Sequence, residues 1–115
     1  MPWGQTMPEM SYSMRASQML ETILEQLEAE SVCDDLDLDI VDGVLTVVFE
    51  DGAHVIINRQ EPLQQIWVAS PLGPAHFGFD AGRAAWIDDK TGATLMDTLS
   101  QAFTRKLGVP VTLRD

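Results

Sequence analysis

The first pattern in the chain is an apolar repeat of three and four residues, which is the spacing of an amphipathic helix. It runs through residues 14–30 and is formed by Leu20, Ile23, Leu24 and Leu27. Three glutamates share another side of the same helix: Glu21, Glu25 and Glu28. The segment is therefore expected to bury one face and to display a row of carboxylates beside it.

The pattern then changes to alternation, the period of a strand, from residue 35 onward. Four strands are expected at 35–40, 44–50, 53–58 and 63–70, and residues 76–80 and 84–87 can supply two more short strands. In the first strand Asp35, Asp37 and Asp39 are expected to share a face. Asp-Gly turn signals at 42–43 and 51–52 predict two successive hairpins, and hence an antiparallel meander.

A second amphipathic helix is expected near the end of the chain. Thr94 followed by Asp97 has the spacing of a capping box at a helix N-terminus. Gly108 and Pro110 mark the end of this helix. The apolar residues of 109–113 are expected to pack against the core.

This order of elements predicts an α+β fold, because amphipathic helices and half-apolar strands must cover one another. We expect a two-layer sandwich in which two helices, N-terminal and C-terminal, pack on one face of an antiparallel sheet of five to six strands. The other face is left for water or a partner. Residues 1–13 lack periodicity and are expected to be a flexible extension, and residues 14–115 a single domain.

The charge is concentrated in one part of the chain. Of the eighteen acidic residues, eleven lie in 21–51, a stretch without Lys or Arg, and the other seven match the seven basic residues in number. Because these acids alternate with Leu, Ile and Val, they indicate a folded acidic surface rather than a solvated tail. Such a surface disfavours nucleic acid and anionic membranes, and suits cations or basic proteins. The simpler interpretation is a face that keeps the protein soluble.

Other chemistry is poorly supported by the sequence. His54 and His76 lack further ligands at zinc spacing, and Cys33 is the single cysteine, which suits a reducing compartment and leaves no disulfide. No phosphate loop or nucleophile motif is present, so an enzyme is not expected. No apolar run or leader-like segment points to a membrane or to export, and a soluble, cytoplasmic protein is expected.

Residues 58–67 resemble the signature of the frataxin family. Six positions carry the match: Asn58, Gln60, Pro62, Gln65, Ile66 and Trp67. Further support comes from Gly43 to Thr46, Ser70-Pro71, His76-Phe77 and Trp86. The resemblance covers about residues 14–108. Without a targeting segment, the chain looks like the bacterial branch of that family.

The resemblance implies an iron-binding protein of iron–sulfur cluster assembly that holds Fe2+ or Fe3+ through carboxylates of the first helix and strand. The matching positions are Glu25, Glu28, Asp35, Asp37 and Asp39. Glu21 and Asp34 are neighbouring carboxylates that we add to this set. It also implies docking on the cysteine desulfurase, and on the cluster scaffold protein as a further candidate. The residues implied in partner contact are Asn58, Gln60 and Trp67.

Several alternatives stay open at this stage. Carboxylates on alternate strand residues lie about 6.5 to 7 Å apart, which favours weak, water-completed iron sites. The protein could donate iron or regulate the desulfurase, as a monomer or in iron-driven oligomers. It could also be an acidic interaction module that never meets iron, and an iron oxidase ranks last. Trp67 could instead be a core aromatic residue.

Overall fold

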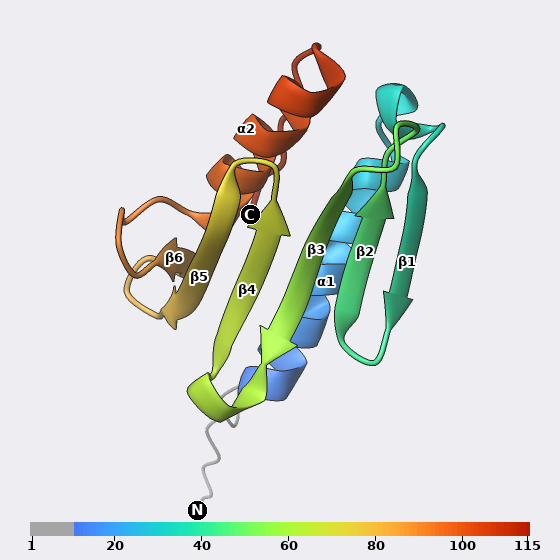
Figure 1. The fold of residues 1–115 in the computed structure, drawn as a ribbon. Helices are drawn as coiled ribbons and strands as arrows, with labels where there is room; N and C mark the ends of the chain where they lie inside the picture. Colours follow the sequence, from blue (N-terminus) through green and yellow to red (C-terminus); the bar gives the residue numbers. More distant parts are fainter. Residues whose placement is uncertain (1–10) are drawn as a thin grey trace, which may run out of the picture.

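The protein is a two-layer sandwich in which two helices cover one face of a six-stranded antiparallel sheet (Figure 1). The structure, a computed structural model, describes residues 11–115. It confirms the predicted fold class. The predicted flexible extension, residues 1–13, falls largely on residues 1–10, which lie outside the described residues.

The elements follow one another as a helix, a meander of strands and a second helix. The helices are α1 (Tyr12–Glu28) and α2 (Leu95–Leu107), with short 3-10 turns η1 (Ser31–Cys33) and η2 (Glu61–Leu63). The strands, which pair in sequence order, are β1 (Asp37–Val41), β2 (Val44–Val48), β3 (His54–Gln60), β4 (Gln65–Ser70), β5 (Gly73–Asp80) and β6 (Ala85–Asp88).

Both helices start at capped N-termini. The side chain of Ser11 accepts a hydrogen bond from the Met14 amide, so α1 begins two residues before the predicted position. In α2 the Thr94 side chain accepts from the Asp97 amide, and Gly108 ends the helix in the left-handed conformation, both as predicted. None of the helices in residues 11–115 has the length and apolar character needed to span a membrane.

Several strand boundaries differ from the predicted ones. The fifth strand, expected to be short and to start at residue 76, begins at Gly73 and has eight residues. The first strand begins at Asp37, because the chain makes the η1 turn up to Cys33 and a further turn through Asp35 before it extends. The prediction that Asp35 shares a strand face with Asp37 and Asp39 is therefore wrong. The fourth strand begins at Gln65 rather than at residue 63, since η2 ends at Gln64 in the left-handed conformation.

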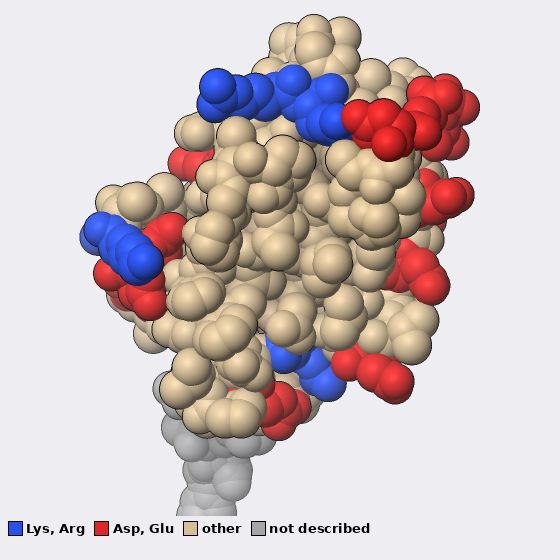
Figure 2. Space-filling model, viewed as in Figure 1, with Lys and Arg blue, Asp and Glu red and all other residues tan. Residues whose placement is uncertain are grey.

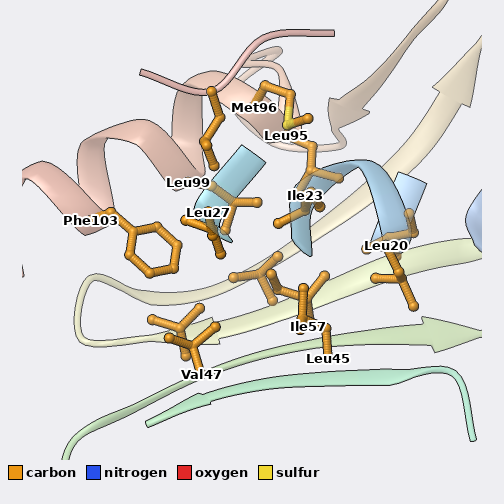
Figure 3. Packing of buried hydrophobic residues seen from close by; sticks show 14 of the residues in the cluster. Leu20, Ile23, Leu27, Leu45, Val47, Ile57, Leu95, Met96, Leu99 and Phe103 are labelled. Carbon is orange, nitrogen blue, oxygen red and sulfur yellow. The ribbon is translucent and has the colours of Figure 1, made fainter. Parts of the chain in front are cut away.

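The core lies between the helices and the covered face of the sheet (Figure 3). Leu20, Ile23 and Leu27 of α1 face the strands at the spacing expected from the sequence. From the sheet, alternate residues such as Leu45, Val47 and Ile57 point toward them and are fully buried. Every second strand residue is thereby directed to the opposite, uncovered face of the sheet, which we call the open face.

The C-terminal tail, residues 109–115, links the two helices. Thr104 and Ser100 of α2 bond the backbone of Val111 and Leu113, both of which are almost completely buried. Gln26 of α1 then makes two bonds to the backbone of Arg114, at 2.6 and 2.8 Å. The prediction that the apolar tail packs against the core is confirmed.

Because the tail completes the core, shortening one of its buried side chains should be costly. We expect Leu113→Ala to lower the free energy of unfolding by about 2–4 kcal/mol, since a buried leucine leaves a cavity when it is truncated. Urea denaturation measures this, and Thr112→Ala is the matched control, because Thr112 is exposed in the same tail. Equal losses for the two variants would contradict a structural role for the tail.

Candidate functional site

Seven carboxylates form a surface that we call the acidic edge. Its members, from α1, the connection after it and β1, are Glu21, Glu25, Glu28, Asp34, Asp35, Asp37 and Asp39. All seven are exposed, and within residues 11–115 none of them makes an ion pair. Acidic side chains line the β1 margin of the molecule in Figure 2. Negative charge therefore accumulates here without compensation.

The strand register fixes which way the two aspartates of β1 point. Asp37 pairs with Val48 and Asp39 with Thr46, so both side chains stand on the open face of the sheet. Their neighbours Leu38 and Ile40 point the other way and pack against the core. The glutamates of the acidic edge come from the other layer of the sandwich, so this surface spans both layers at one side of the molecule.

The spacing of the carboxylates limits how they can hold a cation. Among the described residues, no three His, Cys, Asp or Glu side chains lie close enough together to hold one metal ion. Glu28, Asp34 and Asp37 do line one shallow hollow between the end of α1 and the start of β1. Hard cations take six or more oxygen ligands, so an ion here would keep most of its water molecules. The geometry supports weak attraction of hydrated cations.

Cys33 also lines this hollow but is only 3% exposed. Burial raises the pKa of its thiol, and the nearby carboxylates of Glu30 and Asp34 raise it further. The thiolate, which is the form that reacts and binds soft metals, is therefore disfavoured.

The basic residues that pair with acids do so away from the acidic edge. Lys106 at the end of α2 forms an ion pair and hydrogen bond with Asp51, and this contact is the main reason why the pKa of Asp51 is lowered. Arg83 pairs with Asp80 across the β5–β6 turn, and Arg59 lies 3.9 Å from Glu61. These local pairs leave the charge of the acidic edge unneutralised.

The three residues implied in partner contact are brought together on the open face. Asn58 of β3 pairs with Trp67 of β4, and Gln60 pairs with Gln65 one step further along the same two strands. The side chains of all these residues point to the open face, whereas Ile57 and Ile66 beside them point to the core and are fully buried. Figure 2 shows a broad uncharged surface over the middle of the sheet.

Trp67 is half-buried on the open face and is not a core residue. Its indole ring stacks on His76 of β5 with ring centroids 4.2 Å apart, and its Nε1 donates to Gln65 Oε1 at 2.9 Å. Ile56, Ala69 and Pro74 line a shallow apolar hollow next to the stack. The alternative interpretation of Trp67 as a core aromatic residue is wrong, because its ring stands on the open face, whereas Trp86, only 1% exposed, lies in the core.

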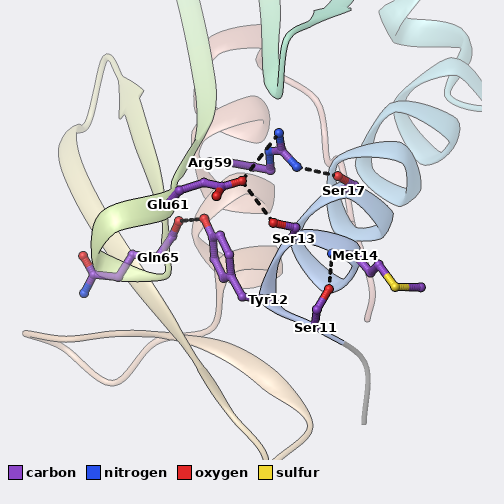
Figure 4. A network of polar contacts seen from close by, with 8 residues as sticks. All are labelled: Ser11, Tyr12, Ser13, Met14, Ser17, Arg59, Glu61 and Gln65. Atoms are coloured by element: carbon purple, nitrogen blue, oxygen red, sulfur yellow. Dashed lines mark hydrogen bonds and ion pairs between the residues drawn. The ribbon is translucent and has the colours of Figure 1, made fainter. Parts of the chain in front are cut away.

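Arg59 holds this part of β3 in place from the covered side (Figure 4). Its Nη1 donates to Ser17 Oγ of α1 at 2.9 Å, and Glu61, beside it, accepts from Ser13 Oγ at 3.0 Å. Tyr12 adds a third link, because its hydroxyl donates to the Gln65 carbonyl at 2.6 Å. The start of α1 is thus bonded directly to the strand ends that carry the contact residues.

Two residues of this site were not assigned a role from the sequence. The sequence indicates no zinc site at His76, and the alternation of β5 alone cannot reveal the stack, which depends on the register between β4 and β5. Arg59 lies inside the recognised signature, but its inward direction follows only from its place between Asn58 and Gln60, which point outward.

Known proteins resemble this chain over most of its length. A sequence profile of the frataxin-like domain matches residues 5–109. The iron–sulfur cluster assembly protein CyaY of Thioalkalivibrio sulfidiphilus is 50% identical over 107 residues, which are 93% of this chain and 100% of that protein.

Solved structures show the same fold. The frataxin from Psychromonas ingrahamii has a TM-score of 0.77 and 31% identity, over 92% of this chain and 100% of its own. The trimeric frataxin of Saccharomyces cerevisiae, solved in complex with ferrous iron, has a TM-score of 0.70 and 28% identity, over 94% and 93% of the two chains.

The contact between Arg59 and the β1–β2 turn gives a direct test of the network. A methyl group on Gly43 would lie 2.4 Å from Arg59 Nε, and the φ angle of Gly43 is +76°. We expect Gly43→Ala to cost about 1–3 kcal/mol more than Gly52→Ala, because Arg59 must also give up buried polar contacts. Gly52 is the control, since its φ is +87° and no atom lies within 4 Å of the added methyl. Equal unfolding free energies in urea would contradict the network.

Proposed function

The chain belongs to the frataxin family, and from that premise we propose that it serves iron–sulfur cluster assembly by binding iron and the cysteine desulfurase at the acidic edge. A role in cluster assembly is what the name of the CyaY relative supports. The observation that carries the finer proposal is the acidic edge itself, whose seven carboxylates are exposed and take part in none of the ion pairs of the described residues.

The physical basis is electrostatic attraction at an exposed surface. Like charges held close together repel one another, and an arriving cation or basic surface relieves that repulsion. Ferrous and ferric ions suit oxygen ligands, and the yeast frataxin structure contains ferrous iron. Because no three ligands converge in the described residues, an iron ion bound here would be held weakly and would keep most of its water.

One surface would then serve two ligands. If iron and the desulfurase both contact the acidic edge, bound iron reduces the charge available to the partner, which couples the two binding events. We therefore favour a regulator of the desulfurase whose docking responds to iron, with iron donation as the second role. We also propose that the protein acts in the cytoplasm, as a monomer that iron drives into oligomers.

The open face supplies the uncharged part of the partner interface in this proposal. Asn58, Gln60 and Trp67 form a polar and aromatic strip at its centre, and aromatic residues are enriched where proteins meet. The strip and the acidic edge are continuous through β1–β3, since Asp39, Thr46 and Ile56 follow one another across the sheet. The desulfurase or the cluster scaffold protein would cover this strip.

The second candidate is an acidic interaction module without physiological iron. The described residues contain no compact metal site, which favours the interaction module. An iron oxidase ranks below both, and it would require Fe2+-dependent oxygen consumption above that of buffer, lost when the acids are neutralised.

Iron binding can be tested by NMR titration with Fe2+ under anaerobic conditions. We expect paramagnetic broadening to be strongest at the amides of residues 21–39, which carry the acidic edge, and to extend weakly into β2, which pairs with β1. The double variant Asp37→Asn with Asp39→Asn should reduce the broadening near β1. Mg2+, which is diamagnetic, controls for simple charge effects. Broadening spread evenly over the domain, or none at millimolar iron, would leave the interaction module as the function.

Desulfurase docking should depend on salt and on the same two aspartates. Exposed charges are screened over about 8 Å at physiological ionic strength, so raising salt should weaken binding by about tenfold or more. Calorimetry compares the desulfurase affinity of the double variant Asp37→Asn with Asp39→Asn and that of a control, Asp89→Asn with Asp97→Asn. The two control residues are exposed acids, one just after β6 and one in α2. The proposal predicts weaker, less salt-sensitive binding for the first variant only. Equal affinities would refute docking at the acidic edge.

A further inference from the structure

The two edges of the sheet are not equivalent. At the β6 edge the Asp88 amide donates to the Ala93 carbonyl at 2.8 Å, and Ile87 bridges to Thr94, so the following segment pairs with this strand. At the other edge β1 is the outermost strand, and no described element lies beside it (Figure 1). An uncovered edge strand presents unpaired backbone groups to other chains.

The alternation of backbone hydrogen bonds across the sheet identifies which N–H and C=O groups of β1 do not bond to β2. Bonds from the Arg59 amide to Gly43 and from the Phe49 amide to Ala53 flank the β2–β3 ladder. Alternation from these two bonds directs Leu45 and Val47 to β3, and the intervening residues of β2 to β1. Asp37, Asp39 and Val41 therefore bond to β2. The N–H and C=O groups of Leu38 and Ile40 point outward from the sheet.

The side chains along this edge select among incoming strands. Asp37 and Asp39 stand two residues apart on the open face, exposed and without an ion pair among the described residues. A second copy aligned antiparallel about Asp39 would place like charges directly opposite each other, which is destabilising. A strand with Lys or Arg at alternate positions would instead pair with both aspartates.

We infer that the β1 edge accepts an extended basic segment of a partner protein as a seventh, antiparallel strand. The segment has the pattern apolar, basic, apolar, basic. Its apolar residues exchange backbone hydrogen bonds with Ile40 and Leu38, and its basic residues lie beside Asp39 and Asp37. Backbone hydrogen bonds hold the segment in an extended conformation, and the two aspartates select segments with basic residues at alternate positions, as side chains do in other strand-addition complexes.

The inference rests on the proposed function in one respect, namely that the partner is basic at its docking surface. It goes further because it specifies backbone pairing, whereas attraction between a basic patch and the acidic edge requires no particular conformation. Strand addition therefore predicts that blocking the backbone amides of the segment's apolar residues, without changing its charge, abolishes its binding to β1.

The test uses the whole protein and a synthetic peptide, Thr-Val-Lys-Val-Lys-Thr, in three forms. The parent peptide and a form N-methylated at the two lysines should bind alike, because the lysine amides point away from β1. The form N-methylated at the two valines has the same charge but cannot pair, and we expect about tenfold or more weaker binding. NMR hydrogen exchange should show slowed amides at Leu38 and Ile40 with the first two forms only.

The outcomes separate this inference from the proposed function. Equal binding of both methylated forms, or unchanged exchange at Leu38 and Ile40, overturns strand addition, even if the desulfurase still docks in a salt-dependent manner. Protection of these two amides by self-association of the protein alone would overturn the preference for a basic segment. Asp37→Asn with Asp39→Asn should weaken the parent peptide, whereas removal of Asp89 and Asp97 should not.

Discussion

The packing of two helices on a single face of the sheet is the constraint on which the rest of the structure depends. Because Leu20, Ile23 and Leu27 must meet Leu45 and its neighbours, every strand residue of the other parity is forced outward. The open face and the acidic edge are thus consequences of the core. The helices determine where contact residues stand, although they do not carry all of them.

The acidic edge is stable only because that core holds it. Side chains in water at this density repel one another, and such repulsion opposes the compact state. Lys106 is paired with Asp51, and Arg59 contacts Ser17 and Glu61, so neither of these basic side chains neutralises the acidic edge. The structure therefore retains a local electrostatic cost that a ligand of opposite charge can relieve, which is what a surface adapted for binding requires.

Much of this could be predicted from periodicity, because helix and strand spacing decide which residues are buried. The α1 stripe, the two Asp-Gly hairpins and the Thr94 cap follow from short-range patterns and were correctly predicted. Asp35 was misplaced, since alternation continues through a turn in which the backbone is not extended. The Trp67–His76 stack and the inward bonds of Arg59 join residues from different elements. A one-dimensional pattern contains no information about such registers.

The position of the C-terminal tail has a consequence for biosynthesis. Gln26 and Arg114 are separated by 88 positions in the sequence, yet their contact ties α1 to the end of the chain. On the ribosome, the meander can form as its hairpins emerge, because its pairings are local. Val111 and Leu113 are synthesised after all six strands and both helices, so the seam between the helices stays unfilled until this segment has left the ribosome. Nascent chains of this protein are thus exposed to chaperones and proteases up to that moment.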